Sequence, residues 1–147
     1  MNGDDAAGVL AARRLAKRLT GNPNILIVEG GSAPENFSGP LRRFNPDWLI
    51  ILDIAQMETK PGGIDWLEMS EIEGVTAATH GLPVSMLANF LIAETKCLVG
   101  ALLIQPASLK FDGALSAEVR AAVDELVDGL VDLLSSVVVR TNDTLEA

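Results

Sequence analysis

The chain has 147 residues and a formal net charge of −9, a length that suits one domain with a single hydrophobic core and no disulfide or structural metal. The negative charge repels phosphate backbones and anionic lipid headgroups, so nucleic acid and membrane surfaces are poor partners. The sequence shows no apolar run of transmembrane length and no signal peptide, and its one cysteine cannot form an internal disulfide. We therefore expect one cytoplasmic domain over residues 1–147.

The first predicted element is a helix over residues 6–20, introduced by two acidic residues. Asp4 and Asp5 stand where N-cap side chains accept hydrogen bonds from unpaired backbone amides, and their charge favours the positive end of a helix. Gly21-Asn22-Pro23 ends the helix. The short apolar run at residues 25–28 then predicts a buried strand.

Three further segments have the pattern of strands. Residues 48–52 are apolar on both faces, as expected for a central parallel strand covered by helices, and Asp53 follows them. Residues 64–69 alternate well enough for a less buried strand, at the edge of the sheet. Residues 97–104 form the last apolar strand.

Helical patterns separate these strands. A brief helix precedes Asn45-Pro46, Pro83 can occupy the first turn of a helix that runs to about Thr95, and Ser116 caps a long helix with apolar positions every 3.6 residues. Alternating strands and helices predict an α/β fold: a three-layer αβα sandwich with a mostly parallel central sheet.

Three polar residues map to one edge of this predicted sheet. Ligands of such folds collect beyond the carboxyl ends of the strands, and Asp53 ends a strand, His80 precedes a helix, and Asp4-Asp5 begin another helix. Carboxylate and imidazole ligands without thiolate suit a divalent ion such as nickel or zinc, with coordination positions left for water or substrate. The spacing of the residues does not choose between these metals.

Each of these side chains also has an ordinary structural use. Asp5 can simply cap a helix, Asp53 can form a turn at a strand end, and His80 can form a hydrogen bond near a helix start. The ordinary use is weakest for Asp53, because a carboxylate after five apolar residues is costly to bury without a partner.

Two other kinds of site find little support. Gly30-Gly31 lies in a loop that runs into Pro34 rather than into a helix, so a nucleotide site is not expected. No serine stands in a G-x-S-x-G context and His80 has no evident nucleophile partner, which disfavours a serine hydrolase.

Five separated motifs are spread over almost the whole chain. They are Gly3-Asp4-Asp5-Ala6-Ala7-Gly8, Gly30-Gly31-Ser32-Ala33-Pro34-Glu35-Asn36, Leu52-Asp53, Thr79-His80-Gly81-Leu82-Pro83 and Ile104-Gln105-Pro106. In this order and spacing the motifs resemble those of the hydrogenase maturation endopeptidases. The stretch GGSAPEN is most similar to the branch that serves formate hydrogenlyase-type hydrogenases.

The resemblance implies an αβα protease that removes a short C-terminal extension from a [NiFe]-hydrogenase large-subunit precursor once nickel has been inserted. In this family two acidic residues and a histidine contact the metal, and by motif position these are Asp5, Asp53 and His80. Asp4 adjoins Asp5 and could exchange roles with it. Nickel would arrive in the precursor, which is the implied partner, and no organic cofactor is implied.

Two other hypotheses remain open. The chain could be a nickel-dependent binding or docking factor that recognises the precursor without cutting it, or an unrelated α/β enzyme of the same architecture. Under the protease hypothesis, the loops around Gly31 and Gln105 could shape the substrate cleft.

One departure from the family concerns the amino terminus. Family members usually begin with a buried strand just before the Gly-Asp-Asp motif, whereas Met1-Asn2 stand directly at that motif here. We therefore expect the family's first strand to be missing, through a misassigned start or a shortened sequence. Its absence would expose strand edges and make self-association plausible.

Overall fold

The central layer of the protein is a small sheet. The computed structural model describes residues 3–68, 81–108 and 113–145. Among these residues the strand order is β1-β3-β2. The strands β1 (Trp48–Ile54) and β3 (Leu98–Ile104) run parallel, and β2 (Ile64–Glu68) pairs with β3 in the antiparallel direction. This confirms the predicted strands at these positions, with β2 at an edge.

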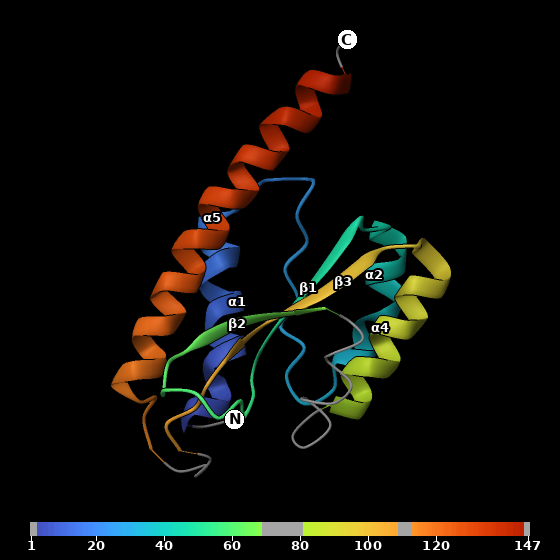
Figure 1. Cartoon of the computed structure of the whole chain (residues 1–147). Helices are drawn as coiled ribbons and strands as arrows, with labels where there is room; N and C mark the ends of the chain where they lie inside the picture. Colours follow the sequence, from blue (N-terminus) through green and yellow to red (C-terminus); the bar gives the residue numbers. More distant parts are fainter. Residues whose placement is uncertain (1–2, 69–80, 109–112, 146–147) are drawn as a thin grey trace.

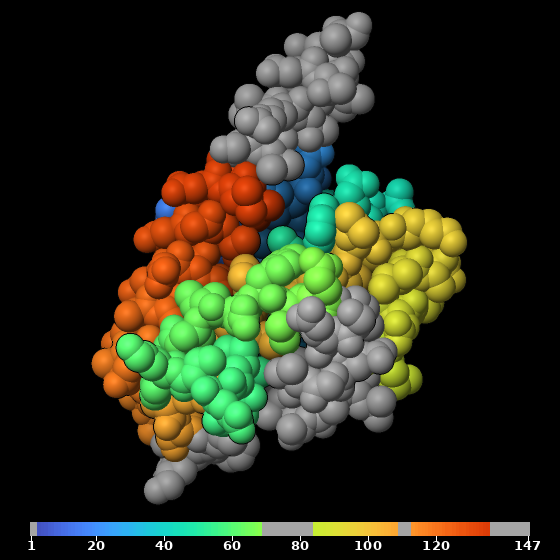
Figure 2. Space-filling view, in the orientation of Figure 1, coloured from blue at the N-terminus to red at the C-terminus, as the bar shows by residue number. Residues whose placement is uncertain are grey.

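Helices cover both faces of this sheet (Figure 1). α1 (Ala7–Arg18) and the long α5 (Ala117–Leu145) lie on one face, and α2 (Ser38–Phe44) and α4 (Gly81–Thr95) lie on the other. The predicted three-layer αβα sandwich is therefore confirmed. Figure 2 shows β2 across the front of the molecule, between α5 and α4.

Each face of the sheet has its own hydrophobic core. On one face Val119 and Val123 of α5, both fully buried, pack with Leu15 of α1 and Ile54 of β1. On the other face, side chains from α2 and α4 pack against alternate residues of the strands; the largest buried members are Leu41, Leu87, Leu91 and Leu103. Because both faces of β1 and β3 contact helices, these strands are mainly apolar, and Asp53 near the end of β1 is their one charged residue.

The long helix α5 follows the predicted pattern closely. The backbone N–H of Val119 donates to the Ser116 hydroxyl over 3.3 Å, which is the predicted N-cap. Its buried stripe includes Leu126 and Leu130, whereas Leu133, which the 3.6-residue period places on the same stripe, is 55% exposed. Although α5 has 29 residues, no helix in the described part of the chain is long and apolar enough to cross a membrane.

The start of α1 differs from the prediction. A 3-10 helix, η1 (Gly3–Ala6), precedes α1, and the residue at the N-cap position is Ala6, which makes no side-chain cap. The N-cap roles predicted for Asp4 and Asp5 are therefore wrong. Asp4 is used elsewhere, as described below.

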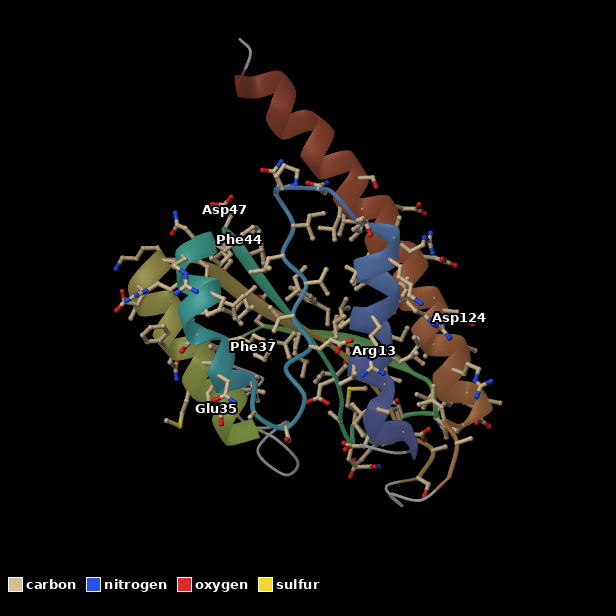
Figure 3. All side chains as sticks on the ribbon, turned by 180° about the vertical axis from the view of Figure 1, so that it is seen from behind. Arg13, Glu35, Phe37, Phe44, Asp47 and Asp124 are labelled. Carbon is tan, nitrogen blue, oxygen red and sulfur yellow. The ribbon has the colours of Figure 1, made fainter. Side chains whose placement is uncertain are left out.

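The predicted strand at residues 25–28 is also wrong. These residues are extended but belong to no strand of the described sheet. Figure 3 shows the segment passing between α1 and α2 without joining the sheet. A strand requires a neighbouring backbone about 4.8 Å away, and here a cavity lies between residues 25–28 and β1. Their apolar side chains nevertheless face the molecule's interior in part.

Candidate functional site

The carboxyl end of β1 holds the first predicted site residue, Asp53. The register pairs Asp53 with Leu103 of β3, which holds this end of the strand within the sheet. The side chain is half-buried, and its Oδ1 accepts the backbone N–H of Ile54 over 2.8 Å. Part of the carboxylate thus has the local turn-forming use expected for a strand end.

Asp5 reaches the same end of β1 because Gly8 allows a close approach. A Cβ atom on Gly8 would lie 3.6 Å from the Cα of Asp53 and would overlap the carbonyl oxygen of Leu52. The first turn of α1 therefore lies directly against the end of β1. Asp5 precedes this turn in η1 and is half-buried.

Asp5 and Asp53 line one shared cavity of about 520 Å³, here called the β1 groove. It lies between residues 48–53 of β1 and residues 24–30. Two of the three predicted site residues, 48 positions apart in the chain, therefore share one cavity at the expected edge of the sheet. Their oxygens are of the type that can contribute to coordination of a divalent cation.

The third predicted residue, His80, lies outside the described residues. Within the described ranges, no group of three histidine, cysteine or acidic side chains is arranged to hold a metal ion. Of the three predicted site residues, the described part of the chain contains Asp5 and Asp53. The position of the His80 side chain stays a prediction.

Asp4 has a different environment from its neighbour Asp5. It is only 3% exposed. Its Oδ1 accepts a hydrogen bond from the backbone N–H of Ser116 over 2.8 Å. Its Oδ2 accepts hydrogen bonds from the backbone N–H groups of Ala107, over 2.8 Å, and Ser108, over 3.3 Å. The hydroxyl of Ser116 also donates to Oδ2, over 3.1 Å. Both oxygens are therefore engaged, and Asp4 ties η1 to the loop after β3 and to the start of α5.

These contacts also determine the charge of Asp4. Burial alone would raise the pKa of this carboxyl group, but hydrogen bonds from Ser116, Ala107 and Ser108 outweigh burial and lower the pKa below its ordinary value. Asp4 is therefore ionised at neutral pH. A buried, fully bonded carboxylate is a structural tie, and this distinguishes Asp4 from Asp5, which lines the β1 groove.

Gln105 supports the same edge of the sheet from the end of β3. It is 3% exposed, and its Oε1 accepts the backbone N–H of Met57 over 2.6 Å. Its backbone N–H donates to the carbonyl of Gly63, and its carbonyl accepts from Gly62, each over 2.8 Å. Gln105 thus holds the segment that follows Asp53. The sequence offers one signal for this role: Gln105 directly follows an apolar strand, and a polar side chain that is buried there requires a hydrogen-bond partner.

A second cavity of about 570 Å³ adjoins the site on the side of α1. Gly3, Gly31 and Ser32 line it, together with the ion pair between Arg13 Nε and Glu29 Oε1, whose atoms are 2.6 Å apart. Gly31 and Glu29 line the β1 groove as well. The loop around Gly31 therefore borders both cavities, and its place beside a substrate cleft stays a prediction.

Comparisons with known proteins point to one family. The family model described as "HycI: Hydrogenase maturation protease" matches residues 9–133, a range that contains Asp53 and His80 and begins four residues after Asp5. The hydrogenase 3 maturation protease of Escherichia coli K12 is 33% identical over 134 residues, which cover 88% of this chain and 82% of that protein.

Solved structures share the fold. The [NiFe] hydrogenase maturation protease HycI from Thermococcus kodakarensis KOD1 is similar with a TM-score of 0.81 and 28% identity, covering 91% of this chain and 85% of that one. The hydrogenase maturating endopeptidase HybD from Escherichia coli has a TM-score of 0.77 and 22% identity, covering 92% and 86%.

Proposed function

Because this chain belongs to the hydrogenase maturation protease family, we propose that it is an endopeptidase that removes the C-terminal extension of a [NiFe]-hydrogenase large-subunit precursor after nickel insertion. The observation that carries this proposal is the shared position of Asp5 and Asp53 along the β1 groove. Two carboxylates from distant parts of the chain line one cavity at the edge of the sheet where α/β proteins bind their ligands.

Nickel is the recognition element in this proposal and belongs to the substrate. Asp5, Asp53 and His80 contact nickel that precursor thiolates already hold, and they complete its coordination. Oxygen and nitrogen donors are compatible with nickel. Contact with the metal places the scissile peptide in register beside these same three residues, so cleavage follows only when the metal is present. Positioning of this kind can supply a large part of a catalytic effect.

The environment of Asp4 supports Asp5 as the acidic residue that contacts the metal. Both oxygens of Asp4 accept hydrogen bonds from the loop after β3 and the start of α5, so moving Asp4 to a metal would break these bonds. Asp5 lines the groove with Asp53. The reaction is proposed for the cytoplasm, where the buried thiol of Cys97 stays reduced.

The test is a cleavage assay with purified nickel-loaded precursor, followed by intact mass. We expect the wild type to cut the precursor, and Asp5→Asn, Asp53→Asn and His80→Ala to lose most of the activity while keeping their fold, as judged by circular dichroism. The matched control is Asp65→Asn. Asp65 accepts the N–H of the next residue, Trp66, over 3.0 Å, just as Asp53 accepts that of Ile54, but Asp65 is exposed on β2.

Two results would contradict the proposal. If precursor without nickel were cut as fast as nickel-loaded precursor, nickel would not be the recognition element. If the wild type bound the nickel-loaded precursor and left it intact, the chain would be a docking factor rather than a protease.

A further inference from the structure

The second cavity, on the side of α1, continues the β1 groove. Val9, Glu29 and Gly31 line both cavities. Asp5 lines the groove, and the residue that follows it lines the second cavity. A ligand held at Asp5 and Asp53 can therefore extend from the groove into the second cavity. A volume of about 570 Å³ suits a short stretch of polypeptide and is far too small for a folded domain.

The two cavities differ in charge. The charged residues that line the β1 groove are all acidic: Asp5, Glu29, Asp47 and Asp53. The second cavity contains Arg13, which is the one positively charged side chain among the described residues that line either cavity. An anionic group of a ligand is therefore repelled along the groove and attracted to Arg13 in the second cavity.

Arg13 has hydrogen-bonding capacity left for such a group. A guanidinium carries five N–H donors. Among the described residues, only the Nε–H of Arg13 has a partner, which is Oε1 of Glu29 at 2.6 Å. The two terminal nitrogens are thus left to bind a carboxylate, whose two oxygens match their spacing. Because Arg13 is 63% exposed, solvent screens its pair with Glu29, and this weak pair does not prevent Arg13 from binding a second carboxylate.

Apolar side chains surround this cation. Val9 and Leu10 of α1 line the second cavity, together with Ala6 and with Leu115 ahead of α5. A mainly apolar wall with one oriented charge is the usual composition of a site that selects one kind of ligand. The side chains of glutamate and aspartate fit this wall, because each has a methylene stem and a carboxylate head.

We propose that the second cavity binds an acidic side chain of the precursor's C-terminal extension, and that Arg13 is the specificity-determining residue that binds its carboxylate. The inference rests on the proposed protease function, in which Asp5 and Asp53 hold the nickel-bearing side of the scissile bond. The extension lies on the other side of that bond, and the second cavity is the space that continues from the groove in that direction.

The test is a charge exchange between the protease and the extension. In nickel-loaded precursors the residues after the scissile bond are replaced one at a time by Glu, Gln or Lys, and kcat and KM are measured for each. The protease is the wild type, Arg13→Gln or Arg13→Glu. Arg18→Gln is the matched control, because Arg18 also forms an exposed ion pair from α1, with Asp128, and lines neither cavity. Circular dichroism checks that each variant keeps the fold.

At one position of the extension the wild type should prefer Glu to Lys by about tenfold in kcat/KM. The difference should lie mainly in KM, because the contact with Arg13 is the same in the bound substrate and in the transition state. Arg13→Gln should abolish this preference, Arg13→Glu should reverse it, and Arg18→Gln should keep it. If the precursors are cut but no position shows a preference that Arg13→Glu reverses, the role of Arg13 is overturned and the protease function stands.

A binding measurement separates this inference from the protease function. Synthetic peptides with the sequence of the extension, carrying Glu or Lys at the same positions, are titrated against the same four proteins by calorimetry. A preference for Glu that Arg13→Glu reverses, without any cleavage of the precursor, would support the second cavity as a binding site and contradict the protease function. Peptide affinities that do not depend on Arg13, together with an uncut precursor, would overturn both proposals.

Discussion

The tie made by Asp4 can be tested by changing one atom of its side chain. Asp4→Asn keeps the size and shape of the side chain but replaces one acceptor oxygen with an NH2 donor. The least costly orientation leaves the amide oxygen in the place of Oδ2, where it still faces Ala107, Ser108 and the Ser116 hydroxyl. The new NH2 group then faces the backbone N–H of Ser116, and two donors meet.

The expected loss of stability follows from these contacts. A hydrogen bond to a charged group contributes about 1.5–3 kcal/mol, and a buried donor left without an acceptor costs about 1–3 kcal/mol. We expect Asp4→Asn to lower the free energy of unfolding by about 2–3 kcal/mol, since the remaining bonds of Asp4 also lose their charge. For a domain of this size the melting temperature should fall by roughly 6–9 °C.

The effect of Asp4 should depend on pH in one direction only. The pKa of Asp4 is lowered in the folded state, so its stabilisation is complete above the unfolded value of about 3.9. It is lost as the pH falls through the still lower folded value, where the carboxyl group takes up a proton. The stability difference between wild type and Asp4→Asn should therefore be constant near neutral pH and shrink at strongly acidic pH.

The assay is thermal unfolding followed by circular dichroism, from neutral to acidic pH. Asp65→Asn is the matched control, because its exposed side chain makes a single local hydrogen bond and its loss should change stability by no more than about 0.5 kcal/mol. An Asp4→Asn variant as stable as Asp65→Asn at neutral pH would refute the structural role of Asp4.

Two further substitutions test the packing around the site. Gly8→Ala should lower stability by about 1–3 kcal/mol, because the new Cβ would overlap the carbonyl oxygen of Leu52. Gly129→Ala should raise stability by about 0.5–1 kcal/mol, because the new Cβ meets open space in the helix α5. If thermal unfolding gave both changes the same sign, the close approach would be wrong. Gln105→Leu should lower the free energy of unfolding, measured in urea, by about 1–3 kcal/mol, because the N–H of Met57 loses its acceptor. The control Gln56→Leu changes an exposed residue and should leave stability nearly unchanged. Equal effects of the two substitutions would contradict this role of Gln105.

The strands and helices that the sequence predicted correctly are those whose pattern reflects burial directly. The runs at residues 48–52 and 97–104 are apolar on both faces because helices cover both faces of the sheet. The stripe of α5 and its Ser116 cap depend on neighbours within one or two helical turns. Such local patterns can be read without knowing the rest of the fold.

The segment at residues 25–28 shows where this reasoning fails. Its apolar run has the composition of a strand, but a strand also needs a neighbour, and here the β1 groove separates it from β1. In the described sheet β1 lies at an edge, and β3 is its neighbour. Composition predicts that a segment is buried, and only the three-dimensional arrangement shows whether it is paired.

In the candidate site too, the sequence predicts some features and misses others. The topology of an α/β sheet predicts that Asp5 and Asp53 lie at one edge. Both line one cavity there, and their joint role in a site stays a prediction. The role of Asp4 was mistaken for a helix cap, because its hydrogen-bond partners lie 103 to 112 positions away in the chain. The position of His80 and the single-domain organisation stay predictions.

Nickel K-edge X-ray absorption of the protein bound to a nickel-loaded precursor that cannot be cut tests the central claim most directly. The proposal predicts oxygen and nitrogen neighbours of nickel in addition to the precursor's sulfur ligands. These neighbours should decrease in number with Asp5→Asn, Asp53→Asn or His80→Ala and stay the same with Asp65→Asn. A nickel coordination shell that is identical in the free precursor, the wild-type complex and all variant complexes would contradict the claim that these three residues contact the metal.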